Sequence, residues 1–129
     1  GLCIECLGNK PGIYSARWAS KYGSFKQAMA KIIQLVKEKN KRKRKKNTKA
    51  KFICSLTLCI NLKKQITTIG TIHGNIASKM LGKNGFGYDP IFIPNRHKLP
   101  FGQMSKKKKI VIDHRFIAFK KLKRKINIL

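Results

Sequence analysis

Acidic side chains are nearly missing from this sequence. Its 129 residues include 31 lysines and arginines but only four acidic residues, which gives a formal net charge of +27. The four carboxylates lie far apart along the chain, at Glu5, Glu38, Asp89 and Asp113. A carboxylate metal site for hydrolysis needs such side chains to converge on the ion. Nothing in their spacing brings them together, so the sequence predicts no complete metal site among these residues.

The excess of positive charge has two explanations. A field of this strength favours polyanions such as nucleic acids, nucleotides or acidic membrane surfaces. Alternatively, a compositional drift toward lysine, isoleucine and asparagine raises the number of basic residues without selecting a partner. Lysines occur in every segment, which favours drift. Contact with nucleic acid is then expected to be non-specific, weak and steeply dependent on salt.

Long hydrophobic runs are also missing. The longest, FICSLTLCI at 52–60, is far too short to cross a bilayer, so no membrane partner is expected. The sequence starts at Gly1 without methionine and without a charged-then-apolar leader, so we expect no signal peptide. We expect the chain to be a fragment, or one whose true beginning has been lost.

A second pair of closely spaced cysteines is lacking. Cys3 and Cys6 form a C-x-x-C, but GLCIECL alternates like a strand and would point the two thiols to opposite faces. Neither another C-x-x-C nor an H-x-x-x-H supplies further zinc ligands. We therefore expect all four cysteines, which include Cys54 and Cys59, to be buried thiols of a reducing compartment, the cytoplasm.

Two common catalytic motifs are absent as well. Gly82 and Lys83 are followed by Asn84 rather than serine or threonine, and no glycine lies five positions before Gly82, so a phosphate-binding loop is excluded. No serine or cysteine sits in a nucleophile elbow beside a plausible base.

The apolar pattern predicts a single layered domain of mixed α/β (α+β) class. A strand is expected at 1–7, a turn at 8–12 and an irregular connection at 13–23. Ser24 and Gln27 fit a capping box for a helix whose apolar stripe runs from Phe25 to Val36. A solvated basic loop at 41–46 precedes strands at 51–61 and 65–73, which pair as a hairpin. A short strand at 88–94 follows a glycine-rich loop, and one last helix runs from a Ser105 cap to about Ile126.

Two stretches can carry chemistry: GFGYDP at 85–90 and KKKKIVIDHRF at 106–116. The first places the ring of Phe86 beside backbone that glycine allows to approach closely. The second places Lys109, His114 and Arg115 in the first half of the last helix. An aromatic plate surrounded by such groups suits a nucleobase, with stacking on its face and hydrogen bonds at its edge. The alternative is an ordinary turn followed by a solvated helix face.

Four segments together resemble the inosine triphosphate pyrophosphatase family, the non-canonical purine NTP pyrophosphatases. They are GLCIECLGNKPGIYSARW, AKFICSL, GNIASKMLGKNGFGYDPIF and a lysine five residues before His-Arg. Their order and spacing match the family pattern across nearly the whole chain. GFGYDPIF and the lysine-to-His-Arg spacing are the specific parts of the match.

The resemblance implies a mixed, partly antiparallel sheet flanked by helices, a homodimer, and Mg²⁺-dependent hydrolysis of ITP, dITP or XTP to the monophosphate and pyrophosphate. Residues 1–129 would be the C-terminal part of such a domain. Phe86 would stack on the purine of the nucleoside triphosphate, while Asp89, His114 and Arg115 would read its edge. The full set of implied substrate contacts is Phe86, Gly87, Tyr88, Asp89, Lys109, His114 and Arg115.

Several departures from the family pattern matter. An Asp-Ser pair that supplies the general base, a phosphate-binding T-G-N-x-x-K and a metal-binding glutamate are not among these residues, so we expect base recognition without cleavage. Asp113 replaces a serine and is expected to pair with Arg115 or a nearby lysine. Phe116 replaces a glycine, and Lys107 and Lys108 replace an acidic pair. A basic nucleic-acid-binding protein and an inactive family remnant are the alternatives.

Overall fold

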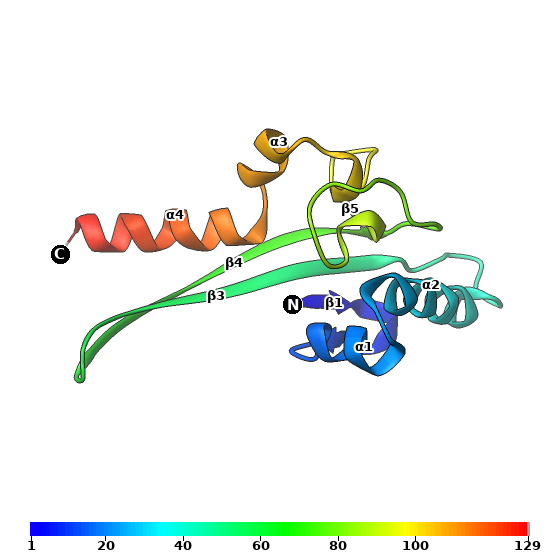
Figure 1. Cartoon of the computed structure of the whole chain (residues 1–129), viewed down its shortest axis with the longest axis horizontal. Helices are drawn as coiled ribbons and strands as arrows, with labels where there is room; N and C mark the ends of the chain where they lie inside the picture. The colour runs from blue at the N-terminus through cyan, green and yellow to red at the C-terminus, as the bar shows by residue number, and fades with distance from the viewer. Residues whose placement is uncertain (129) are drawn as a thin grey trace.

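The computed structural model describes residues 1–128, which fold into a five-stranded sheet with helices packed on it (Figure 1). The sheet order is β2-β1-β3-β4-β5, and each of these strand pairs is antiparallel. The α+β class is therefore confirmed. The strands are β1 (Leu2–Ile4), β2 (Lys10–Gly12), β3 (Lys49–Asn61), β4 (Lys64–Ile76) and β5 (Phe92–Pro94). The helices are α1 (Ser15–Tyr22), α2 (Phe25–Asn40), α3 (Lys106–Ile110) and α4 (His114–Asn127), with 3-10 turns at Glu5–Leu7, Asp89–Ile91 and Phe101–Gln103.

The predicted hairpin is confirmed and dominates the shape of the molecule. Strands β3 and β4 each have 13 residues and pair along their length. Strand β1 pairs with β3 only at 50–52, and β5 pairs with β4 only at 74–76. The remaining residues of β3 and β4 therefore project as a two-stranded arm (Figure 1).

Helix α4 supports this arm, which would be marginally stable as an isolated two-stranded ribbon. It lies along the arm in Figure 1, with Ala118 and Leu122 buried against it. The Thr68 hydroxyl donates a hydrogen bond of 2.7 Å to the Ala118 carbonyl. A Cβ on Gly70 would overlap the backbone of His114 and Ala118. The absence of a side chain at this glycine therefore sets the position of α4.

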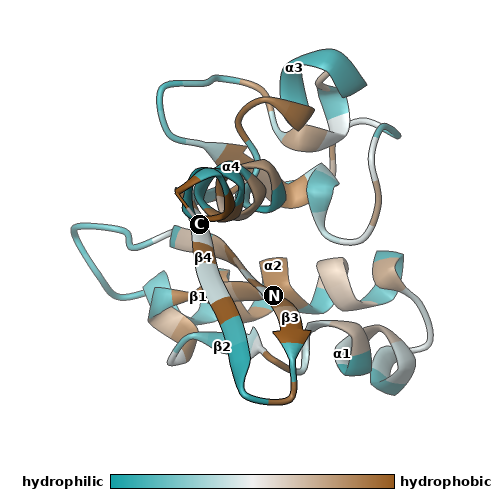
Figure 2. Cartoon of the chain, turned by 90° about the vertical axis from the view of Figure 1, so that its left-hand side faces the viewer, coloured by the Kyte–Doolittle hydropathy of each residue, from teal (hydrophilic) through white to brown (hydrophobic). Residues whose placement is uncertain are grey.

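The core lies on one face of the sheet. Alternate residues of the paired strands share that face, because Leu2 is opposite Phe52 and Ile4 is opposite Ala50. Helix α2 packs its apolar stripe on them, and the core also includes Tyr88, Ile91, Phe92, Phe101 and Met104. Figure 2 shows that hydrophobic and hydrophilic residues are interspersed along the helices. The Ser24 side chain accepts from the Gln27 amide at 3.1 Å, as the sequence predicted.

Five expectations about local structure were wrong. The turn expected at 8–12 contains strand β2, and the strand expected at 88–94 begins only at Phe92, after a 3-10 turn. The connection expected to be irregular at 13–23 contains helix α1, whose Ala19 is buried and whose Trp18 and Tyr22 pack against the core. The expected strand at 1–7 ends at Ile4 and continues as a 3-10 turn. The last helix is two helices, because Asp113 interrupts the run and caps α4 by accepting from the Phe116 amide at 2.8 Å.

The cysteines are less buried than expected. All four are free thiols, three of them partly exposed and Cys59 exposed. Burial raises the pKa of the Cys6 thiol above its ordinary value. Within residues 1–128, no helix combines the length and the apolar composition needed to cross a membrane.

Candidate nucleotide site

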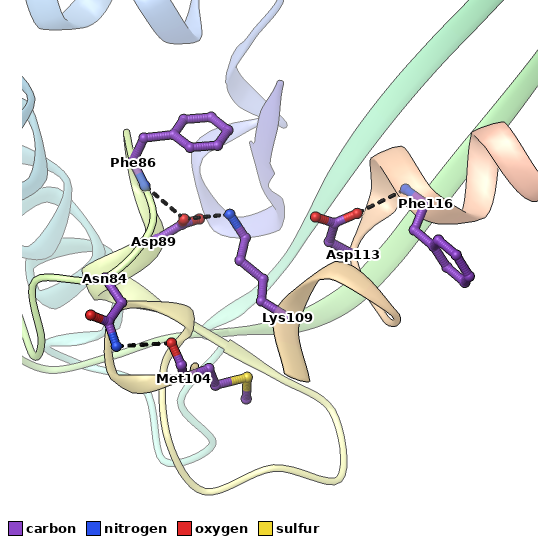
Figure 3. Close-up of polar contacts among 7 residues, drawn as sticks. All are labelled: Asn84, Phe86, Asp89, Met104, Lys109, Asp113 and Phe116. Atoms are coloured by element: carbon purple, nitrogen blue, oxygen red, sulfur yellow. Dashed lines mark hydrogen bonds and ion pairs between the residues drawn. The ribbon is translucent and has the colours of Figure 1, made fainter. Parts of the chain in front are cut away.

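A buried ion pair organises the candidate site. The Lys109 ammonium of α3 donates to Asp89 Oδ2 at 2.6 Å, and the two side chains are 11% and 4% exposed. The same oxygen accepts from the Phe86 amide at 3.0 Å (Figure 3). A carboxylate with these two charge-assisted partners is held in one orientation. Asp89 therefore ties the glycine-rich loop to α3.

The backbone of this loop allows that contact. Gly85 has a φ of +74°, and a Cβ there would overlap the Asp89 carboxylate. The loop is also tied to the segment that precedes α3. Asn84 donates from its backbone amide to the Gly102 carbonyl at 2.9 Å and from its side chain to the Met104 carbonyl at 2.9 Å (Figure 3). These hydrogen bonds fix the position of the loop that carries Phe86.

Phe86 presents its ring to two cations. Its side chain is 57% exposed. The Lys109 Nζ lies 4.4 Å from the ring centroid and the Arg115 Cζ lies 4.6 Å from it. Both distances are within the range of cation–π attraction. The structure thus brings together three of the residues that the sequence singled out, from the loop, from α3 and from the start of α4.

These three residues line a groove of about 870 Å³ between the glycine-rich loop, α3 and α4. This volume is near the upper end of typical ligand sites. Much of the lining is apolar. Several lining residues could not be predicted from the sequence, because they reach the groove only through the way α3 packs beside α4. The remaining lining residues are Asn84, Gly85, Met104, Ser105, Lys106, Ile110, Asp113, Phe116 and Phe119.

Two other expected contact residues, Gly87 and Tyr88, do not line the groove. Tyr88 is 3% exposed, and its hydroxyl donates to the Ser15 carbonyl at 2.6 Å. Its burial raises the pKa of the Tyr88 phenol to about 12, so it stays a neutral donor. Gly87 has a φ of +61°, a left-handed conformation that favours glycine. In this arrangement, Gly87 and Tyr88 shape the loop, and Tyr88 anchors it to α1.

His114 faces the core and not the groove. It is 8% exposed, and its ring stacks on Phe52 with centroids 4.9 Å apart. Its Nδ1 has no hydrogen-bond partner among the described residues. Burial lowers the pKa of His114 to about 4, against a smaller opposing effect of Asp113, while Arg115 and Lys109 lower it further. The imidazole is therefore neutral at neutral pH.

This buried histidine predicts a pH dependence of stability. The folded-state pKa of about 4 lies below the ordinary 6.5, so between these values the unfolded chain binds a proton that the folded chain does not. The free energy of unfolding should be unaffected by this group above pH 6.5 and should fall as the pH drops toward 4. The slope contributed is at most about 1.4 kcal/mol per pH unit.

Urea unfolding of wild type and His114→Phe at several pH values measures this slope. The phenylalanine keeps a ring against Phe52 and cannot titrate, so the variant's stability should be flatter between pH 6.5 and 4. His97→Gln, at an exposed histidine, is the matched control and should retain the wild-type slope. Equal slopes in all three proteins would contradict the prediction.

Asp113 does not pair with Arg115 or with a lysine, contrary to expectation. Its carboxylate caps α4 instead, and the one ion pair among residues 1–128 is that of Asp89 with Lys109. A carboxylate at a helix N-terminus satisfies free amide groups and interacts favourably with the helix dipole.

The described residues do not fit a metal ion by themselves. No three metal-ligating side chains gather anywhere in residues 1–128. Each carboxylate already has a partner: Glu5 accepts from Asn47 at 2.8 Å and Glu38 from Gln34 at 3.2 Å, while Asp89 and Asp113 are engaged as described above. What the groove offers is an aromatic face with donors beside it.

Comparisons with a family profile, with curated sequences and with solved structures all identify the same family. The Ham1 family profile matches residues 1–125. A dITP/XTP pyrophosphatase of Clostridium tetani is 37% identical over 98% of this chain, and one of Zymomonas mobilis is 39% identical over 95%. Solved structures agree with the sequence relatives. A HAM1 protein from Coxiella burnetii matches 100% of this chain and 64% of its own chain, with a TM-score of 0.89 and 29% sequence identity. A nucleoside-triphosphatase / dITP/XTP pyrophosphatase from Mycobacterium abscessus matches 95% of this chain and 62% of its own, with a TM-score of 0.76 and 28% identity. The chain spans 60% and 57% of the length of the two curated relatives.

Proposed function

This chain belongs to the Ham1 family, and on that premise we propose that it is the nucleobase-recognising part of a nucleotide-pool pyrophosphatase. The complete reaction would hydrolyse ITP, dITP or XTP to the monophosphate and pyrophosphate. Residues 1–129 would be the C-terminal part of the domain that does so. The family match and the relatives named for dITP and XTP support this assignment.

The observation that carries the proposal is the convergence of Phe86, Lys109 and Arg115 on one groove. A purine can lie against the exposed ring, and the two cations can donate to an acceptor on its edge. In the structure the Lys109 and Arg115 side chains lie over the face of the Phe86 ring. A bound base would therefore displace the cations from the ring face toward the edge of the base, where both can donate.

The other expected contact residues then take supporting roles. Asp89 holds Lys109 in place, and Gly87 and Tyr88 shape the loop that carries Phe86. His114 sets the first turn of α4, from which Arg115 reaches the groove. We assign no catalytic residue within the chain.

Three further features belong to the proposal. We take Mg²⁺ as the cofactor, because pyrophosphate chemistry needs developing charge to be neutralised and Mg²⁺ is commonly bound through substrate phosphates. The described carboxylates do not form its cage. A homodimer and a cytoplasmic setting follow from the family resemblance of the sequence motifs.

Calorimetric titration of the chain with ITP, XTP and ATP, each with Mg²⁺, tests the proposal. We expect ITP and XTP to bind about tenfold or more tightly than ATP, because the two donors face a keto group in the former and an amino group in the latter. Inorganic triphosphate is the control for attraction between phosphates and the net charge of +27. If triphosphate bound as tightly as ITP, or ATP as tightly as XTP, the base-recognition function would be wrong.

A further inference from the structure

A second surface, which adjoins the groove at Phe119, consists of the outer side of α4 and the β3–β4 arm. The sequence has no acidic residue at 39–88 or at 114–129, so neither element contributes a negative side chain. No ion pair in the described part of the chain neutralises a cation of α4. The two elements lie side by side (Figure 1). The arm contributes Lys63 and Lys64 at its tip, and most of the positive charge of this face comes from α4.

Backbone contacts fix the cations of this face relative to the arm. The Lys121 ammonium donates to the Ile69 carbonyl at 2.8 Å, and Lys125, one helical turn later, approaches the Thr67 carbonyl at 3.5 Å. Both carbonyls belong to the part of β4 that β5 does not cover. The lysines thus protect an open strand edge and hold α4 against it.

A cationic groove of about 420 Å³ follows this seam. Its lining combines hydroxyls and positive side chains: Thr67, Thr68, Ile69, Lys121, Arg124 and Lys125. Lys120 and Lys123 are exposed on the same helix. Phe119, which is 55% exposed and also lines the candidate nucleotide groove, precedes them. Such a set offers phosphate contacts together with one stacking surface.

We propose that this face, formed by α4 and the β3–β4 arm, binds the phosphodiester backbone of single-stranded nucleic acid. The 14 residues of α4 span about 21 Å at about 1.5 Å per residue, which matches roughly six phosphates of a stacked strand. Cations and hydroxyls contact the phosphates, and a base stacks on Phe119. Binding is independent of sequence, because no group on this face is arranged to read base edges.

The position of the basic residues distinguishes binding at a defined surface from binding that depends only on the total positive charge. The loop at 41–46 is as basic as α4 but lies at the other end of the hairpin, about 40 Å from its tip for strands of 13 residues. If total charge alone governed binding, removing three cations from either place would have the same effect. A defined surface makes the two effects unequal.

The test measures the affinity for a labelled single strand of about 12 nucleotides by fluorescence anisotropy. The salt concentration is varied from about 50 to about 200 mM, where the affinity depends strongly on salt. One variant carries Lys120→Gln, Lys123→Gln and Arg124→Gln. The matched control carries Arg42→Gln, Lys43→Gln and Arg44→Gln. The first should lower the slope of log K against log salt by about 2, since each lost phosphate contact removes about 0.7. The control should keep the wild-type slope, and circular dichroism checks that both variants are folded.

Two additional measurements sharpen the result. Phe119→Ala should weaken binding of the strand about fivefold or more through lost stacking. The triple α4 variant should bind ITP as wild type does, since its three positions do not line the candidate nucleotide site. Equal slopes for the two triple variants would overturn the proposal. So would binding of anionic lipid vesicles that matches the oligonucleotide in affinity and in sensitivity to the α4 variant.

Discussion

Asp89→Ala is expected to lower the free energy of unfolding by about 3–5 kcal/mol, the range for breaking a buried ion pair by removing one partner. The substitution leaves the Lys109 ammonium in a position where its side chain is 11% exposed, with no carboxylate beside it. It also removes the acceptor of the Phe86 amide. The loop and α3 should loosen together, because Asp89 joins them.

A double-mutant cycle distinguishes this pair from ordinary packing. Lys109→Met removes the ammonium and keeps most of the apolar stem. In Asp89→Ala/Lys109→Met no uncompensated charge remains, so the double variant should recover a large part of the loss seen in Asp89→Ala. Urea midpoints at pH 7 provide the measurement.

Glu5→Ala is the control for loss of a carboxylate, since Glu5 is exposed and contacts only Asn47 by hydrogen bond. Its cost should stay within about 0.5 kcal/mol. If Asp89→Ala cost no more than Glu5→Ala, or if the two substitutions of the cycle were additive, the pair would not be the organising contact of the site.

The long hairpin could be predicted from the sequence because its cause is local. Side chains of β3 alternate over 13 residues, and a short turn joins it to a second alternating run. The Ser24 cap was predictable for the same reason, since the Ser24 hydroxyl and the Gln27 amide that donates to it are three residues apart. Helix α1 was missed because its stability comes from packing of Trp18 and Tyr22 on a core built from distant segments.

The candidate site was predictable only in part. The motif resemblance identified Phe86, Lys109 and Arg115, and the structure places all three on one groove. The motif resemblance could not reveal that the His114 side chain faces the core. Adjacent helical residues point about 100° apart, so when Arg115 faces the groove His114 can face the core. Which of them does so is set by Gly70, whose missing side chain lets the start of α4 lie directly on β4.

Arg115→Ala is expected to reduce the preference for ITP over ATP by about tenfold to a hundredfold, the value of a hydrogen bond from a charged donor. A guanidinium can only donate hydrogen bonds, so it favours the 6-keto oxygen of hypoxanthine and opposes the 6-amino group of adenine. Sites that satisfy a specific polar group can discriminate by roughly four to five powers of ten, so one donor accounts for part of the possible range.

Dissociation constants of ITP and ATP for wild type, Arg115→Ala, Phe86→Ala and Arg124→Ala separate the roles of these residues. Phe86→Ala should weaken both nucleotides by a similar factor, because stacking does not depend on the substituent at position 6. Arg124→Ala removes an exposed arginine of the same helix outside the groove and should change neither constant beyond its effect on net charge. If Arg115→Ala weakened ITP and ATP equally, its guanidinium would contact phosphate rather than base. Base discrimination would then rest on Lys109, which Asp89 holds at the same ring.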